Sequence, residues 1–377
     1  MINMNPSNKR NPWSVRMVNS VLTRYPLEQA EWHYEHGLMV KAIAATGEDS
    51  GESRYTDFAR AWVDWFVAPD GSIRTYRVDE FNLDQVNAGK LLFQPYIQTG
   101  ELRYRKALDT LRNQLHNQPR TLSGGFWHKK IYPYQMWLDG LYMAAPFYAE
   151  YALVFDEPEA FDDIIHQFAL IEEHTRDPQT GLLYHAWDES KAQRWANPQT
   201  GCSPHFWGRA MGWYTMALVD VLDFLPPSHP KYGVVLAIFQ RLAAALIRFQ
   251  DGATGLWHQV VDAAGRPGNY RESSVSAMLA YGFAKGVRKS LLGSEYLLSA
   301  QRAYRGLLEN QIKIDANGLL TLENTCGAAG LGGNPYRDGS YNYYVNEKIV
   351  PNDFKGVGPF VLAALEMETI PIAQTGD

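Results

Sequence analysis

The chain has 377 residues, of which 46% are hydrophobic and 13% aromatic. This length allows a large buried core, built either as two ordinary domains or as one large closed architecture. Thirty-five basic and 41 acidic residues give a net charge of −6, and an acidic chain without a basic run is a poor binder of nucleic acid. No apolar stretch is long enough to span a bilayer, so we expect neither nucleic acid nor membrane as a partner.

The first eleven residues are polar and lack the apolar centre of a secretory signal. The two cysteines, Cys202 and Cys326, do not make a disulfide framework, and neither has a Cys or His at metal-ligand spacing beside it. We interpret both as packing residues and expect a cytoplasmic protein. Residues from 1 to about 10 are expected to form a short flexible segment of a single-domain chain.

Two kinds of helical stretch alternate along the sequence. Amphipathic stretches, which suit the outside of a fold, lie at about residues 12–24, 53–67, 101–117, 159–174, 232–249 and 294–311. More apolar stretches, which suit its inside, lie at about residues 33–46, 84–99, 137–155, 205–225, 273–288 and 356–368. Helical hairpins that alternate about six times must bury their faces against one another. We therefore predict an all-α fold, an (α/α)6 barrel over residues 1–377, with an open solenoid as the alternative.

One carboxylate, Asp139, interrupts the apolar and aromatic run Gln135–Met143 at the start of the third inner helix. Burial of an ionised carboxylate is costly unless the group is paired or becomes partly protonated. A carboxyl group held near that balance is suited to general acid/base chemistry. The alternative is that Asp139 only caps a helix or bonds to a buried backbone group.

The loops that lead into the inner helices would converge at one end of such a barrel and line one pocket. They are rich in histidine and aromatic residues, and a convergent polar and aromatic pocket is the default candidate for a functional site. A second acid, Asp84, starts the second inner helix, and neighbouring helices lie about 8–10 Å apart, so it would face Asp139. Glycoside hydrolysis uses a pair of carboxyl groups. Two carboxylates at close range also raise the pKa of one of the pair.

Other side chains in these loops suit a sugar ligand. Trp137, Trp187 and Trp213 offer flat faces for sugar rings. Lys129 and Arg209 suit an anionic substituent, with arginine favouring a bidentate contact to a carboxylate.

The histidines do not form a convincing zinc set, although His33 and His36 have a suggestive spacing. The sequence also contains no phosphate loop, dinucleotide fingerprint or nucleophile elbow. We expect no metal and no cofactor. Whether His33 or His36 lies in the site stays open.

Seven runs of the sequence carry a resemblance to a known family. They are Trp32–Tyr34, Gly124–Lys129, Tyr132–Met143, Tyr184–Asp188, Trp207–Tyr214, Asp338–Tyr341 and Asn352–Gly358. Together they look like the unsaturated rhamnogalacturonyl hydrolases, glycoside hydrolase family 105. The resemblance covers nearly the whole chain, and its central run is quite specific.

This resemblance implies an (α/α)6 barrel and a cytoplasmic, exo-acting enzyme. The implied substrate is a small oligosaccharide ending in a 4,5-unsaturated uronic acid, as polysaccharide lyases leave on pectin. The resemblance matches Asp139 to the general acid/base, and we predict Asp84 as its catalytic partner. The predicted substrate-binding residues are Tyr34, His33, His128, Lys129, Trp137, His185, Arg209 and Trp213.

The implied first step is hydration of the C4=C5 double bond rather than direct glycosidic cleavage. That bond and the ring oxygen form an enol ether, so protonation of C4 by Asp139 leaves positive charge on C5 and the ring oxygen. Water then adds at C5 while ionised Asp139 takes its proton, and the resulting hemiketal opens and releases the sugar at C1. Asp84, if ionised, would stabilise the cation and orient the water.

Three other functions remain as alternatives. The first is a hydrolase that removes unsaturated glucuronate from oligosaccharides derived from glycosaminoglycan or ulvan. The second is an inverting glycosidase on saturated sugars, which needs a second carboxylate about 6.5–9.5 Å away with room for water. The third is a non-catalytic sugar-binding toroid, which would tolerate replacement of Asp139.

Overall fold

The computed structural model describes residues 12–370, and the segment predicted to be flexible lies outside this range. Within it, the outer helices alternate with inner ones as the sequence predicts. The outer helices are α1 (Trp13–Arg24), α3 (Ser53–Phe66), α5 (Leu102–Asn117), α7 (Ala160–Thr175), α9 (Tyr232–Ile247) and α11 (Glu295–Asn310). The inner helices are α2 (Tyr34–Ser50), α6 (Leu138–Val154), α8 (Gly208–Val221), α10 (Ser273–Arg288) and α13 (Phe354–Thr369).

The second inner position differs from the prediction of one helix over residues 84–99. Two short 3-10 helices, η4 (Leu83–Gln85) and η5 (Asn87–Leu92), precede the short helix α4 (Phe93–Thr99). The Asn82 side chain accepts a hydrogen bond from the backbone N–H of Asp84, and the Asn87 side chain donates to the carbonyl of Tyr142. Such side-chain bonds to backbone compete with a regular α-helix and favour tight turns.

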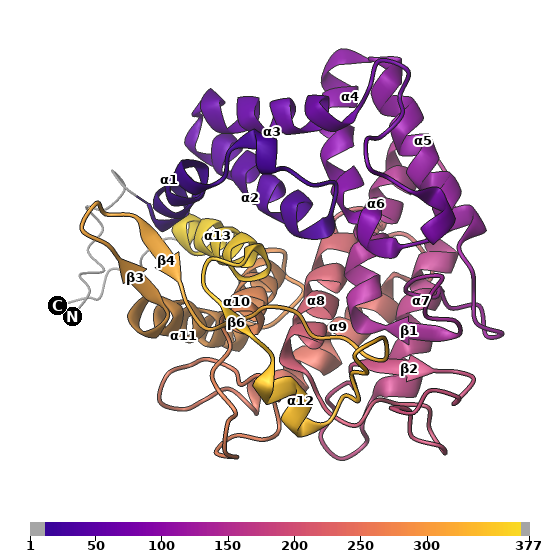
Figure 1. Ribbon diagram of the computed structural model, residues 1–377, viewed down its shortest axis with the longest axis vertical. Coiled ribbons are helices and arrows are strands. Elements are labelled where there is room, and N and C mark those ends of the chain that lie inside the picture. The colour runs from indigo at the N-terminus through magenta and orange to yellow at the C-terminus, as the bar shows by residue number, and fades with distance from the viewer. Residues whose placement is uncertain (1–11, 371–377) are drawn as a thin grey trace.

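The inner segments form a closed ring. Each one packs on the next, and α13 packs on α2 as well as on α10, so the last inner helix returns to the first. Figure 1 shows α13 between α2 and α10. The fold is therefore the predicted (α/α)6 barrel, and the open solenoid is excluded.

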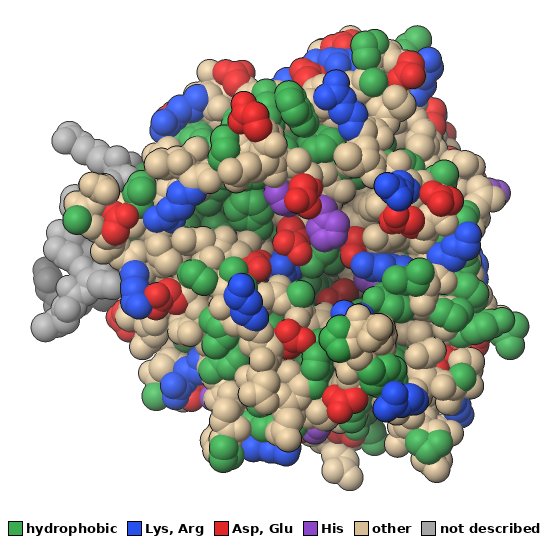
Figure 2. All heavy atoms as spheres, in the orientation of Figure 1, with side chains coloured by type: hydrophobic (Ala, Val, Ile, Leu, Met, Phe, Trp, Pro, Cys, Tyr) green, Lys and Arg blue, Asp and Glu red, His purple; other side chains and the backbone are tan. Residues whose placement is uncertain are grey.

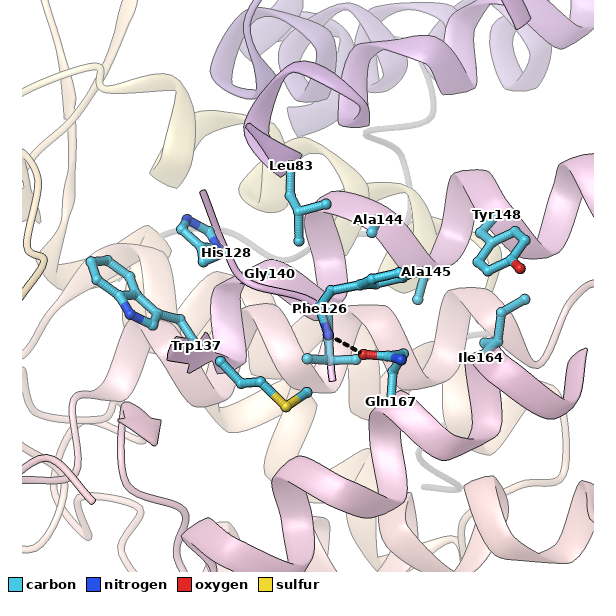
Figure 3. A pocket seen from close by; sticks show the side chains of 12 residues that line it. Leu83, Phe126, His128, Trp137, Gly140, Ala144, Ala145, Tyr148, Ile164 and Gln167 are labelled. Carbon is cyan, nitrogen blue, oxygen red and sulfur yellow. Dashed lines mark hydrogen bonds between the residues drawn. The ribbon is translucent and has the colours of Figure 1, made fainter. Parts of the chain in front are cut away.

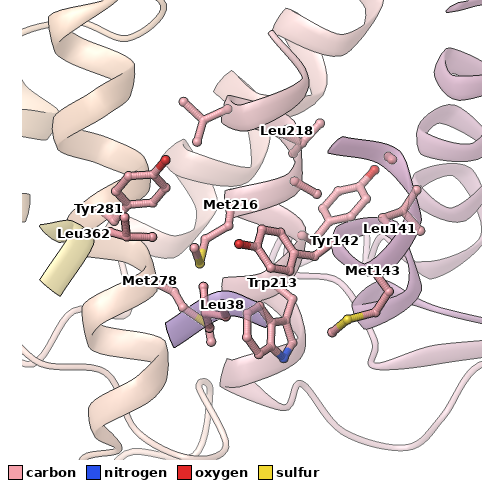
Figure 4. Packing of buried hydrophobic residues seen from close by; sticks show 14 of the residues in the cluster. Leu38, Leu141, Tyr142, Met143, Trp213, Met216, Leu218, Met278, Tyr281 and Leu362 are labelled. Atoms are coloured by element: carbon pink, nitrogen blue, oxygen red, sulfur yellow. The ribbon is translucent and has the colours of Figure 1, made fainter. Parts of the chain in front are cut away.

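The centre of the ring is filled by large apolar side chains that come from different inner helices. Trp213 of α8 stacks on Tyr142 of α6 with ring centroids 4.9 Å apart. Leu38, Met278 and Leu362 join this cluster from α2, α10 and α13 (Figure 4). Burial of each such side chain contributes about 1.5–3 kcal/mol to folding, so the packing at the centre stabilises ring closure.

The short strands lie in the loops between helices. Strand β1 (Gln135–Trp137) pairs antiparallel with β2 (Ala186–Asp188), and Trp137 lies opposite Ala186. The other pairs are β3 (Ile312–Ile314) with β4 (Leu320–Leu322) and β5 (Thr325–Cys326) with β6 (Ile349–Val350). The remaining short helices are η2 (Leu27–Gln29), η3 (Val78–Glu80) and α12 (Tyr341–Asn346). Because β1 leads directly into α6, its pairing fixes where that inner helix starts.

Two findings bear on the broad class of the protein. Among residues 12–370, no helix is both long and apolar enough to cross a membrane. Cys202 and Cys326 are both buried as free thiols, in keeping with the prediction that they are packing residues.

The end of the ring where the inner helices finish encloses a cavity of about 1140 Å³ lined by charged side chains. Asp220 accepts hydrogen bonds there from Lys41 at 2.9 Å, Lys285 at 2.7 Å and the Tyr281 hydroxyl at 2.6 Å. Glu150 near the end of α6 also lines this cavity, and its burial raises the pKa of the carboxyl group to about 7. Its carboxyl group is therefore partly protonated at neutral pH.

The raised pKa of Glu150 predicts a pH-dependent stability. Between pH 4.5, the ordinary pKa, and about pH 7 the folded state keeps a proton that the unfolded state has lost. Folding therefore weakens as the pH rises through this window, by up to about 3 kcal/mol from this one group. In Glu150→Gln this contribution is absent, so the melting temperature of the variant minus that of the wild type is expected to increase from pH 4.5 to 7 and then level off. The exposed Glu309→Gln on α11 is the control, and a difference independent of pH for Glu150→Gln would contradict the assignment.

Candidate active site

The candidate site lies at the end of the ring where the inner helices begin. Figure 2 shows that this face is hollowed near its centre, where histidine, acidic and basic side chains gather. The residues that bring chemistry to the hollow stand at the first turns of inner segments or just before them, and they are Tyr34, Asp84, Asp139, Arg209, Glu272 and Lys355. Helix N-termini carry partial positive charge, so this end of the ring favours an anionic ligand.

Asp84 is buried beneath a group of cationic and imidazole side chains. Lys129 Nζ lies 2.5 Å from Asp84 Oδ2, His128 Nε2 lies 3.3 Å from Oδ1, and His33 Nε2 lies 4.0 Å from Oδ2. Burial alone would raise the pKa of Asp84, but the charge of Lys129 and the contact with His128 hold it well below its ordinary value. Asp84 is therefore ionised across the neutral range.

Asp139 has one buried and one open carboxyl oxygen. Oδ2 is buried without a hydrogen-bond partner and lies 3.2 Å from Nε2 of the fully buried His185. Oδ1 makes no hydrogen bond within the described residues and is accessible to solvent. Among residues 12–370, no lysine or arginine lies within 4.0 Å of this carboxyl group. The two acids thus differ, because Asp84 is neutralised by a cation and Asp139 is not.

An aromatic wall borders both acids. Its three nearly parallel rings are His128, Trp137 and Tyr132. The Trp137 centroid lies 4.9 Å from His128 and 4.8 Å from Tyr132, and the centroids of His128 and Tyr132 lie 6.4 Å apart. The His185 ring meets Trp137 edge-on at 5.3 Å. Since His128 touches Asp84 and His185 touches Asp139, the wall connects the surroundings of the two carboxyl groups.

Behind this wall lies a small apolar cavity of about 10 Å³, the space of about one water molecule (Figure 3). It is bordered by β1, α6 and α7, and the backbone N–H of Phe126 donates to Gln167 beside it at 2.7 Å. The cavity is too small for a sugar, so it belongs to the packing that holds His128 and Trp137.

The floor of the hollow is formed by Tyr34 and Trp213. Trp213 is only 1% exposed, with Tyr142 stacked on it and Tyr34 meeting it edge-on at 5.9 Å. It therefore offers no open face to a sugar ring. Trp187 does not border the hollow either, because its ring stacks on His174 at 3.8 Å.

The two predicted anion-binding cations are both engaged by protein acids. The Arg209 guanidinium is 1% exposed and donates to Ser274 at 2.7 Å, to Glu272 at 3.1 Å and to the carbonyl of Cys326. Lys129 is bound to Asp84, but its side chain is 22% exposed. Lys129 thus has room to contact a ligand, whereas Arg209 is tied into the wall between α8, α10 and β5.

The structure separates the two histidines whose placement the sequence leaves open. His33 lies beside Asp84, as described above. His36 is instead bonded through Nδ1 to the Tyr25 hydroxyl at 2.6 Å, packs against Phe354, and makes no contact with either acid. His33 therefore belongs to the site and His36 to the packing around it.

Three residues near the site were not among the predicted site residues. Tyr344 bonds to His185 Nδ1 at 2.8 Å, and Lys355 Nζ lies 2.8 Å from Glu35 and 3.0 Å from Asp353. Arg337 donates to the hydroxyl of Tyr132 at 2.9 Å. The sequence gives a signal for two of them, because Tyr344 and Lys355 lie in the loop that leads into the last inner helix and was expected to line the pocket. The signal for Arg337 is only that it precedes the run Asp338–Tyr341.

Comparisons with known proteins identify the family and the fold of the chain. The sequence model of the family described as Glycosyl Hydrolase Family 88 matches residues 13–370. A glycoside hydrolase from family 105 of C. acetobutylicum ATCC 824 has a similar structure, with 46% identity, a TM-score of 0.93, and coverage of 96% of this chain and 100% of that chain. The unsaturated rhamnogalacturonyl hydrolase YesR of Bacillus subtilis (strain 168) is 30% identical over 273 residues, which are 69% of this chain and 74% of that protein.

A more distant structure shares the fold alone. The unsaturated glucuronyl hydrolase of Bacillus sp. GL1 matches with 14% identity and a TM-score of 0.68, over 94% of this chain and 95% of that chain.

Close packing at Gly140 yields a test of the His128 position. A Cβ atom at Gly140 would lie 2.9 Å from His128 Nδ1, so Gly140→Ala must displace the imidazole that contacts Asp84. We expect kcat/KM on an unsaturated uronyl substrate to fall about tenfold or more, because misplacement of site groups by an ångström is costly. Gly233→Ala in α9 is the matched control, since it makes the same helical exchange with no atom within 4 Å of the new carbon. Equal activity of the two variants would show that His128 tolerates the displacement.

Proposed function

The chain belongs to Glycosyl Hydrolase Family 88 and resembles a family 105 member throughout, and we propose that it releases terminal 4,5-unsaturated galacturonic acid from the products of pectin lyases. The observation that carries the proposal is the Asp139 carboxyl group, with one oxygen buried against His185 and the other accessible to solvent. A carboxyl group without a cationic partner in an aromatic surrounding is suited to hold a proton and to deliver it.

The different surroundings of the two acids assign their roles. Asp84 is kept ionised by Lys129 and His128, so it has no proton to give at neutral pH. Asp139 is therefore the acid that protonates C4 of the enol ether. The ionised Asp84 stabilises the positive charge that develops on C5 and the ring oxygen, at the moment when that charge forms.

The second half of the reaction uses the same carboxyl group. Once Asp139 has given its proton to C4, it is a carboxylate and takes a proton from the water that adds to C5. The hemiketal formed at C5 opens, and the bond at C1 to the next sugar then breaks without a nucleophile from the protein. One side chain serves as acid and then as base, so the cycle returns Asp139 to its starting state.

The uronate carboxylate is accommodated by the charge of this end of the barrel. The N-termini of the inner helices face the hollow, and Lys129 keeps part of its ammonium group accessible beside Asp84. Arg209 is saturated by protein acceptors, so we assign it the task of holding β5 and Glu272 in place rather than gripping the substrate.

Two alternatives are weaker. An inverting glycosidase would need Asp84 as a general base, but a carboxylate with a strongly lowered pKa is a poor base. Unsaturated glucuronate as the terminal sugar remains the second candidate. It is supported by the shared fold of the glucuronyl hydrolase, whereas the rhamnogalacturonyl hydrolase is similar in sequence as well.

Replacement of the acid tests the mechanism. Asp139→Asn keeps the shape of the side chain but removes its proton transfer, so we expect turnover to fall about a thousandfold in a folded variant. The assay is the loss of ultraviolet absorbance of the alkene in lyase-digested rhamnogalacturonan. Asp162→Asn, an exposed change on outer helix α7, is the control and is expected to keep full activity. Wild-type rates in Asp139→Asn would exclude it as the acid.

The substrate class is tested by a panel of lyase digests. Equal concentrations of unsaturated ends from rhamnogalacturonan, glycosaminoglycan and ulvan are compared by kcat/KM. The highest value is expected for rhamnogalacturonan, and a higher value for a glucuronyl end would replace it by the second candidate. Turnover of none of the three would refute the proposed function.

A further inference from the structure

A buried tyrosine lies behind the histidine that contacts the acid. Tyr344 of α12 is fully buried, and its hydroxyl lies 2.8 Å from His185 Nδ1. The other nitrogen of that ring, Nε2, lies 3.2 Å from Asp139 Oδ2. Tyr344, His185 and Asp139 thus form a chain of three polar groups that ends at the Asp139 carboxyl group.

For a neutral His185 ring, only one arrangement of protons suits an ionised Asp139. The Tyr344 hydroxyl makes no other hydrogen bond within residues 12–370, and burial raises the pKa of this phenol well above its ordinary value, so it keeps its proton. If Nδ1 carried the imidazole proton, the lone pair of Nε2 would face the lone pairs of Oδ2, and both buried atoms would stay unpaired. If the tyrosine donates to Nδ1, the proton is on Nε2 and faces Oδ2.

We infer that Tyr344 is a positioning residue for the reaction, whose hydroxyl donates to His185 Nδ1 and thereby keeps the His185 proton on Nε2, toward Asp139. This inference rests on the proposed function. It also distinguishes the two oxygens of Asp139, because Oδ2 is stabilised by the Nε2 proton. The transferable proton is then carried by Oδ1, the oxygen that is open to the hollow.

The pH profile of the reaction is the most specific readout of this role. Besides His185 and Tyr344, Tyr34 of α2 lies within electrostatic range of Asp139, and Glu35, Asp84 and Arg209 lie within range of the same Tyr34. Tyr344→Phe removes the donor that orients His185 and leaves these other groups in place. The carboxylate form of Asp139 then loses stabilisation, so the alkaline limb of kcat/KM against pH moves to higher pH, by about half a unit, and kcat falls about tenfold.

The control is Tyr341→Phe on the same short helix. Tyr341 is also buried, but its hydroxyl donates to the carbonyls of Arg266 and Pro267 at 3.0 and 2.9 Å. This variant is expected to keep the wild-type pH profile. Equal losses in both variants without a shift of the limb would mean that Tyr344 is only structural.

A second measurement needs no change at Tyr344. In wild-type protein labelled with nitrogen-15 in histidine, the signals of His185 are identified by their absence in His185→Gln. Protonated Nε2 and unprotonated Nδ1 are expected at neutral pH, and the opposite tautomer would overturn the inference. If the wild type turned over no unsaturated substrate, the proposed function would fail, whereas the tautomer would still report on the hydrogen-bond chain.

An independent observation concerns Arg337, at the far end of the aromatic wall. Its Nε donates to the Gly332 carbonyl at 2.9 Å, and its Nη2 donates to Tyr132 at 2.9 Å and to the Leu331 carbonyl at 3.2 Å. All of these acceptors are neutral. Within residues 12–370, no carboxylate lies within 4.0 Å of this guanidinium, unlike Lys129 with Asp84 and Arg209 with Glu272.

One nitrogen of Arg337 is not engaged by the protein. Nη1 makes no hydrogen bond within the described residues and is accessible to solvent. The guanidinium packs against Gly330, where a Cβ atom would lie 2.5 Å from Nη1, so the glycine is what lets Arg337 take this position. Arg337 is half-buried, and a half-buried cation with free donors and no counter-ion is suited to bind an anionic oxygen group.

The geometry points to Arg337 as a specificity-determining residue that binds an anionic group, a carboxylate or a sulfate, on the sugar chain beyond the scissile bond. This inference about Arg337 also rests on the proposed function. His128 contacts Asp84, Tyr132 contacts Arg337, and the centroids of these two rings lie 6.4 Å apart, so Arg337 is within reach of a sugar chain that starts near Asp84.

The test compares substrates rather than variants alone. Arg337→Met is assayed on an unsaturated uronyl–rhamnose disaccharide, on the tetrasaccharide with a further galacturonate, and on a disaccharide with sulfated rhamnose. The kcat/KM of the disaccharide, which has no anionic group beyond the unsaturated uronate, is expected to change less than about threefold. The substrate with a further anionic group that wild type prefers is expected to lose about tenfold to a hundredfold in kcat/KM. The anionic substrate whose kcat/KM falls shows whether Arg337 binds a carboxylate or a sulfate.

Arg337→Lys keeps the charge and is expected to restore part of the discrimination. Equal losses of kcat/KM on all substrates, or no loss on any, would show that Arg337 only holds its own loop in place. If the wild type cleaved none of the three, the proposed function itself would be wrong.

Discussion

The ion pair between Lys129 and Asp84 is the contact that makes the two acids of the site different from each other. It holds one of two neighbouring acids in its charged form and leaves the other without a cation. Two equivalent carboxylates would compete for one proton, and neither would be a dedicated acid. Because only Asp84 is neutralised, the proposed mechanism assigns proton donation to Asp139 and stabilisation of the resulting cation to the fixed negative charge of Asp84.

Ring closure is what brings these groups together. The loops and first turns that carry them come from inner segments far apart in the sequence, and they meet only because α13 packs back on α2. The same closure gives the two ends of the barrel different electrostatics. At one end helix N-termini surround a hollow with histidines and an uncompensated acid, whereas at the other end Asp220 is matched by Lys41 and Lys285. The first end therefore suits an anionic sugar, which explains why the larger cavity at the second end is not the better candidate site.

Most of the polar side chains around the hollow are held by other protein groups rather than free. Arg209 spans from α8 to α10 and β5, and Lys355 bonds Glu35 and Asp353. Buried ion pairs of this kind add little to the free energy of folding, but loss of one partner leaves the charge of the other buried and unpaired. Their contribution is to hold the first turns of the inner helices in one geometry, in which Asp139 Oδ1 and part of Lys129 stay accessible to solvent.

The sequence by itself was sufficient to predict the alternation of outer and inner helices and the position of Asp139 at the start of α6. Both follow from the 3.6-residue period and from a carboxylate in an apolar run, which are local patterns. It failed where local bonding overrides periodicity, as in the 3-10 turns around Asp84 that Asn82 and Asn87 favour. Only the tertiary structure decided that Lys129 pairs with Asp84, that Arg209 pairs with Glu272, and that His33 rather than His36 borders the hollow. Tyr344 meets His185 across 159 residues, and such partnerships depend on how the closed ring aligns its loops, which no local pattern in the chain encodes.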